Sequence, residues 1–112
     1  ITEYPLDMSW GYQTIGYYAT TSRYGNPNEF KAFVDKAHEL GLGIILDFAY
    51  SHFCKDIHGL YRFDGSAQYE YASPLKAENL AWGTAHFDVG KPEVKSFLLS
   101  NAIYWFKEYH VD

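Results

Sequence analysis

A carboxylate and an imidazole stand five residues apart after a short apolar run, and both could take part in chemistry. The run is Ile44-Ile45-Leu46, followed directly by Asp47 and later by His52. Gly41 and Gly43 before the run, together with its unbroken apolar character, predict a strand over 44–48 that is buried on both faces. Ligands bind at the carboxyl ends of such strands in parallel α/β folds. The pattern allows two interpretations equally: a binding role for Asp47 and His52, or a loop-capping aspartate with a partly exposed loop histidine.

A second group of candidate residues combines aromatic rings with glycines. It comprises the segments Ser9-Trp10-Gly11-Tyr12-Gln13 and Gly16-Tyr17-Tyr18. Rings beside glycines allow a planar ligand to approach the backbone closely. The alternative is a loop that packs these rings onto its own scaffold.

Two helices are expected to position these residues. The first begins at Pro27, because Asn26 can cap it and Glu29 can complete a capping box, and it ends at Gly41. Its apolar stripe contains Phe30, Phe33, Val34, Ala37 and Leu40. We expect His38, near its end, to be solvated or at the edge of the core rather than a ligand.

The second helix is expected over 92–109. One wide face carries apolar and small residues, which is typical of a helix packed against a sheet and a neighbouring helix. Leu99 and Ile103 widen this face, and Trp105 and Phe106 are expected in the core. The remaining members of the face are Val94, Phe97, Leu98, Asn101, Ala102 and Tyr109.

Residues 53–90 form a long connection without clear periodicity, which we interpret as a structured excursion over the functional face. Its scattered histidines and aspartates match no metal-ligand spacing, so no metal site is expected. These residues are Asp56, His58, Asp64, His86 and Asp88. The chain also has no glycine-rich phosphate loop and no serine nucleophile elbow.

The order of elements is a strand tail within 1–5, a helix, a strand and a second helix. This βαβα pattern predicts an α/β fold, about two βα units of a (β/α)8 TIM barrel. A complete barrel needs roughly 250 residues, so we interpret residues 1–112 as one fragment of a barrel domain. Unpaired strand edges predict that the fragment does not fold stably alone.

Composition restricts the partners. A net charge of −5 argues against nucleic acid or an anionic membrane. No run is long enough to span a membrane, and no signal-peptide pattern opens the chain. The single cysteine, Cys54, cannot form an internal disulfide, which favours the cytoplasm. Aromatic residues make up 20 %, which suits either sugar faces or a large packed interior.

Several phrases closely resemble the glycogen (α-1,4-glucan) branching enzymes of the α-amylase superfamily. Those most specific to branching enzymes are Ser9-Trp10-Gly11-Tyr12-Gln13 and the Phe63-Asp64-Gly65 loop. The Asp47-to-His52 pair is shared across the superfamily and is less specific. The resemblance continues through Trp82-Gly83-Thr84 and the final helix, so it covers essentially the whole chain.

The resemblance implies a barrel enzyme that cleaves α-1,4-glucan and attaches the released segment to a 6-hydroxyl, by retaining glycosyl transfer and without a cofactor. Asp47 and His52 resemble the pair that holds the sugar at the cleavage subsite, and Tyr12 the tyrosine that stacks on it. The catalytic nucleophile and acid/base are expected beyond Asp112, which resembles the start of the fourth barrel strand. The fragment then runs from the end of strand 2 to the start of strand 4, with no catalytic carboxylate.

Two positions depart from the family pattern. Phe48-Ala49-Tyr50 replaces the usual Trp-Val-Pro, and His86 stands where asparagine is usual. Two other interpretations stay open. One is a non-catalytic fragment whose aromatic residues bind glucan. The other is a different α-amylase superfamily hydrolase, such as a debranching or trehalose-releasing enzyme.

Overall fold

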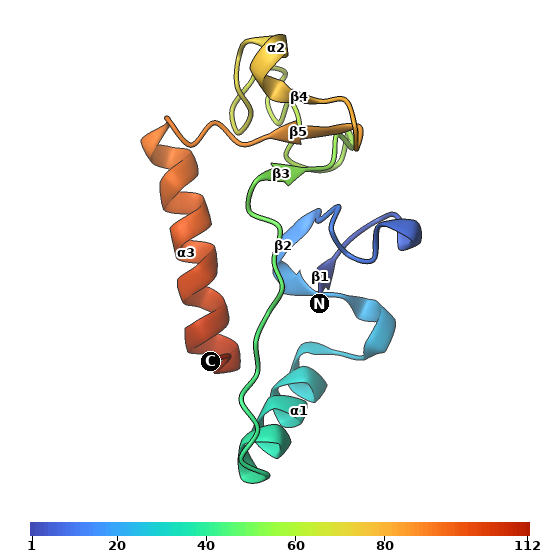
Figure 1. Ribbon diagram of the computed structural model, residues 1–112, viewed down its shortest axis with the longest axis vertical. Coiled ribbons are helices and arrows are strands. Elements are labelled where there is room, and N and C mark those ends of the chain that lie inside the picture. Colours follow the sequence, from blue (N-terminus) through green and yellow to red (C-terminus); the bar gives the residue numbers. More distant parts are fainter.

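A computed structural model describes residues 1–112, and its main feature is one long extended segment that passes beside two helices (Figure 1). The helices are α1 (Pro27–Glu39) and α3 (Pro92–Tyr109). The extended segment, green in Figure 1, leads from the end of α1 to β3. The other elements are short: β1 (Thr2–Glu3), η1 (Asp7–Ser9), β2 (Gly16–Thr20), η2 (Ser22–Tyr24), β3 (His52–Phe53), α2 (Pro74–Ala77), β4 (Glu78–Asn79) and β5 (Thr84–His86).

These strands form two small antiparallel sheets. β1 pairs with β2, and the second sheet has the order β3-β5-β4. In the second sheet His52 lies opposite His86, and Phe53 opposite Ala85. The connection 53–90 is therefore structured, as expected. Its strands are only two or three residues long, which is too short for alternation to be visible in the sequence.

The first helix begins and ends as the sequence predicts. The side chain of Asn26 accepts from the Glu29 backbone N–H at 3.1 Å, and the Glu29 carboxylate accepts from the Asn26 N–H at 2.7 Å. This is the predicted capping box. At the other end Gly41 has φ +75° and donates its N–H to the His38 carbonyl at 2.9 Å. A glycine in the left-handed region ends the helix without the steric cost of a side chain.

The predicted strand over 44–48 is extended but unpaired, so the expectation of a strand buried on both faces was wrong for this chain. Its one backbone–backbone hydrogen bond runs from the Asp112 N–H to the Ile44 carbonyl, at 2.8 Å. Ile45 is 90 % exposed, and Asp47 is exposed as well. A barrel strand is buried only when neighbouring strands flank it. Within residues 1–112 the expected neighbour, β1, pairs with β2 instead.

Aromatic side chains make up most of the two buried clusters. The first lies between the small sheet and the start of α3 and contains Tyr17, Phe53, Ala85, Phe87 and Val94. The second lies near the end of α3 and contains Trp105, Tyr109 and Val111. Trp105 is in the core as expected, but Phe106 is 54 % exposed. The expectation for Phe106 was wrong because its side of α3 has no covering element in residues 1–112.

A buried amide connects α3 to the rest of the fold. Asn101 is fully buried; its Nδ2 donates to the Tyr17 carbonyl at 2.6 Å, and its Oδ1 accepts from the Tyr50 hydroxyl at 3.0 Å. The indole Nε1 of Trp105 donates to the same Tyr17 carbonyl at 3.1 Å. These bonds join the helix to β2 and to the extended segment.

Replacing this amide should destabilise the fold. In the full-length protein, Asn101→Leu is expected to lower the free energy of unfolding by about 1–3 kcal/mol, because the buried Tyr17 carbonyl loses one of its donors and the Tyr50 hydroxyl loses its acceptor. Urea denaturation followed by tryptophan fluorescence measures the change. Asn28→Leu on the exposed first turn of α1 is the matched control. Equal stability of both variants would show that the buried bonds contribute nothing.

Candidate functional site

A serine side chain and a glycine shape the loop that carries Tyr12. The hydroxyl of Ser9 accepts from the N–H groups of Gly11 and Gln13, at 3.3 and 3.4 Å. Gly11 has φ +89°, and a Cβ there would lie 3.6 Å from the Tyr4 ring. That backbone conformation favours glycine. The turn leaves Tyr12 46 % exposed, so its ring is available to a ligand.

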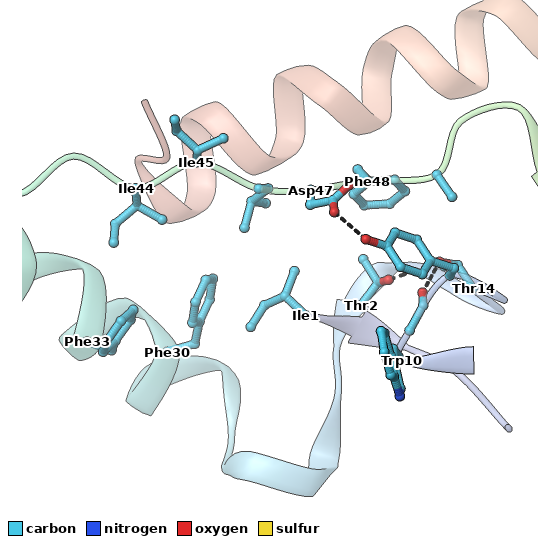
Figure 2. A pocket seen from close by; sticks show the side chains of 14 residues that line it. Ile1, Thr2, Trp10, Thr14, Phe30, Phe33, Ile44, Ile45, Asp47 and Phe48 are labelled. Carbon is cyan, nitrogen blue, oxygen red and sulfur yellow. Dashed lines mark hydrogen bonds between the residues drawn. The ribbon is translucent and has the colours of Figure 1, made fainter. Parts of the chain in front are cut away.

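Tyr12 and Asp47 are in direct contact. The Tyr12 hydroxyl donates to Oδ2 of Asp47 at 2.5 Å, although the two residues lie 35 positions apart. The dashed line that ends at Asp47 in Figure 2 marks this bond. The bond and the negative charge of Asp47 raise the pKa of Tyr12. The phenol is therefore held as a protonated donor to a carboxylate.

His52 lies at the start of β3 and is only 4 % exposed. Its carbonyl accepts from the Tyr17 hydroxyl at 2.9 Å, which fixes the backbone, but its ring Nδ1 has no hydrogen-bond partner in the protein. Burial lowers the pKa of His52, and His86 opposite lowers it further. The imidazole is thus neutral at pH 7, with one nitrogen able to donate and the other able to accept.

A cleft of about 630 Å³ brings Tyr12 and His52 together. Asp47 borders a second hollow of about 420 Å³, which Tyr12 also lines. In Figure 2 this hollow lies between the extended segment at Ile44 and the rings of Phe30 and Phe33. Tyr12 therefore lines both hollows, the first together with His52 and the second together with Asp47. Residues that line the cleft include Leu6, Met8, Tyr12, Gln13, His52 and Trp82.

Sequence reasoning missed two residues of the cleft. Trp82 lines it with its ring centroid 4.9 Å from that of His52, and Gln13 donates from Nε2 to the Trp82 carbonyl at 3.2 Å. Both residues belong to phrases that carry the family resemblance. The available signal was a tryptophan followed by a glycine in a segment without periodicity, and that signal alone does not specify a site.

The carboxylate of Asp112 is occupied by contacts within the protein. Its Oδ2 accepts from the Ile44 backbone N–H at 2.7 Å and from His38 Nε2 at 2.8 Å. The Ile44 N–H and then the His38 ring lower the pKa of Asp112. His38 thus contacts Asp112 at the edge of the fold, and Asp112 serves to hold the extended segment.

The thiol of Cys54 has a structural role rather than a reactive one. Cys54 is buried and donates its thiol to the Thr14 carbonyl at 3.1 Å. Burial, with a smaller contribution from Asp56, raises its pKa to about 12, so the thiol stays protonated.

No three His, Cys, Asp or Glu side chains gather where they could hold a metal ion. Neither long helix is apolar enough to cross a bilayer.

Comparison with known proteins identifies the family. The model of the alpha-amylase catalytic domain matches residues 2–82. The 1,4-alpha-glucan branching enzymes GlgB of Bacillus caldolyticus and Geobacillus stearothermophilus are 61 % and 58 % identical over all 112 residues. The chain spans only 17 % and 18 % of those two proteins.

Solved structures support the same fold. The alpha-amylase of Geobacillus thermoleovorans, in complex with acarbose, matches the whole chain with a TM-score of 0.81 at 21 % identity, over 27 % of its own length. An Anoxybacillus alpha-amylase matches equally well, at 23 % identity and over 26 % of its length. The expected partial (β/α)8 barrel is thereby confirmed. The chain belongs to the alpha-amylase family, as a part of its catalytic barrel whose curated relatives are branching enzymes.

Proposed function

We propose that this chain is the substrate-positioning part of a 1,4-α-glucan branching enzyme. Such an enzyme cleaves an α-1,4-glucan and joins the released segment to a 6-hydroxyl, forming an α-1,6 branch. The observation that carries the proposal is the 2.5 Å hydrogen bond between Tyr12 and Asp47, beside the cleft that Tyr12 shares with His52. The relatives that bear this enzyme's name are 55–61 % identical to the chain.

The three side chains supply complementary contacts to one glucose unit. The exposed ring of Tyr12 offers a flat face to the C–H face of a pyranose. The second carboxylate oxygen of Asp47 and the part of the His52 imidazole that lines the cleft are the proposed partners of the sugar hydroxyls. Contacts that tighten as the ring flattens toward an oxocarbenium ion lower the barrier to transfer.

The bond-breaking groups belong to other residues of the whole enzyme. Retaining transfer needs a nucleophilic carboxylate and an acid/base carboxyl about 5–5.5 Å apart. Asp112 does not serve as the nucleophile in this proposal, since its carboxylate is held by Ile44 and His38. We assign both catalytic carboxylates to residues after Asp112, as the resemblance implies. This chain then holds the substrate while those groups react.

The proposed partner is a glycogen- or amylose-like glucan, and the proposed compartment is the cytoplasm. The cleft suits such a ligand because it combines aromatic rings with a few polar groups. The free, buried thiol of Cys54 accords with a reducing compartment.

Incubation of the full-length protein with amylose tests the proposal. Branching is expected to lower the absorbance of the amylose–iodine complex while the number of reducing ends stays constant. Debranching of the product with isoamylase should then release new short chains. A hydrolase would instead raise the number of reducing ends, and a non-catalytic glucan-binding protein would retain amylose without changing it. Either result would overturn the proposal.

A further inference from the structure

One tryptophan of this chain is exposed inside the cleft. Trp82 is 60 % exposed and lines the cleft with Tyr12 and His52, whereas Trp105 is 2 % exposed and lies in the core. Removing the apolar surface of an indole ring from water is favourable, so a ring that lines a cleft is suited to contact a ligand there.

The position of Trp82 is nevertheless well fixed. The backbone carbonyl of Trp82 accepts from Gln13 Nε2 at 3.2 Å, and the backbone N–H of Trp82 donates to Oδ1 of Asn79 at 3.3 Å. Gly83 follows with φ +66°, which ends the turn in the left-handed region. The indole packs on His52, with the ring centroids 4.9 Å apart and the planes tilted by 48°. The backbone of Trp82 is thus fixed, and the contact with His52 orients its ring before any ligand binds.

We propose that Trp82 is a further glucan-binding residue, which stacks on a glucose unit of the chain next to the one held by Tyr12 and His52. The inference rests on the proposed function, because it extends the same cleft. A rigid aromatic face loses little conformational entropy on binding and suits the C–H face of a sugar. Two polar side chains, the Tyr12 phenol and the His52 imidazole, line the same cleft and favour a hydroxylated ligand over an apolar packing partner.

Stacking on a neighbouring unit should affect substrate binding more than the chemical step. In the full-length enzyme, Trp82→Ala is expected to raise KM for amylose about 10-fold, while kcat changes less than about threefold. Trp82→Phe, which keeps a ring, should restore most of the affinity. Trp82→Leu, which keeps apolar bulk against His52 without an aromatic face, should not.

Leu80→Ala is the matched control. Leu80 is 89 % exposed in the same turn and does not line the cleft, so its removal should leave KM unchanged. Titration with maltoheptaose, followed by calorimetry, gives a second measurement that does not depend on turnover. The dissociation constant should rise about 10-fold in Trp82→Ala and Trp82→Leu, and far less in Trp82→Phe.

The outcomes separate this inference from the proposed function. An active branching enzyme whose KM and maltoheptaose affinity are the same in Trp82→Ala would overturn the inference alone. Equal rescue by Leu and Phe would also overturn it, because Trp82 would then act only by packing on His52. A drop in melting temperature with unchanged affinity leads to the same conclusion. If the wild type binds maltoheptaose through Trp82 but forms no branches, the inference stands and the proposed function fails.

Discussion

Asp47→Asn in the full-length enzyme is expected to lower kcat/KM for amylose by about 100-fold, a loss of roughly 2.7 kcal/mol of transition-state stabilisation. Asparagine keeps the shape of the side chain and removes its charge. The charge-assisted bond from Tyr12 becomes weaker, and so do the contacts from Asp47 to the sugar hydroxyls. Initial rates of amylose branching, measured over a range of substrate concentrations, give the two constants.

The contact between Tyr12 and Asp47 also predicts that their effects are coupled. Tyr12→Phe should lower kcat/KM by about 10-fold, and the double variant should lose less than the product of the two single losses. Asp35→Asn, on the exposed side of α1, is the matched control and should leave kcat/KM unchanged. A kcat/KM of Asp47→Asn within threefold of the wild type would remove Asp47 from the site. Fully multiplicative losses would show that the observed bond has no role in catalysis.

The isolated 112-residue chain is expected to show no cooperative thermal transition, in contrast to the full-length enzyme. Only 20 of its 112 residues are buried, and its radius of gyration is 15.2 Å. A compact domain of this length would have a radius of about 13 Å. Ile45 and Leu42 on the extended segment are largely exposed. Too little apolar surface is removed from water to offset the conformational entropy of folding.

Differential scanning calorimetry of the isolated chain measures this directly. We expect a broad, weak change in heat capacity and strong binding of the dye ANS to exposed apolar surface. A longer piece that adds the neighbouring barrel strands is the control and should regain a sharp endotherm, because those strands cover residues 44–48. A sharp endotherm from the 112 residues alone would contradict the prediction.

Local signals predicted the helices well. The capping box at Asn26, the left-handed glycine at Gly41 and the apolar face of 92–109 depend on residues within one or two turns of each other. Such features are encoded locally, so a sequence pattern suffices to find them. Phe106 differs from expectation because its side of α3 would be covered only by other parts of a barrel.

Features that depend on distant segments were harder to predict. The burial expected for the strand over 44–48 depends on neighbours that residues 1–112 do not supply. The family resemblance implied that Tyr12 and Asp47 bind the same sugar, but their hydrogen bond was not predicted, because no local pattern joins residues 35 positions apart. Trp82 lies in the turn between β4 and β5, and these strands are too short to be recognised from the sequence. Whether Tyr12, Asp47 and His52 hold one sugar stays a prediction.

The pairing of His52 with His86 limits how such enzymes can vary. Side chains alternate between the two faces of a strand, so a slip of one residue between β3 and β5 would turn His52 away from the cleft. Insertions and deletions should therefore be tolerated in the turns of the 53–90 connection and be harmful within its paired residues. Natural length differences among relatives should accumulate at the tips of that connection, leaving the spacing from His52 back to Asp47 unchanged.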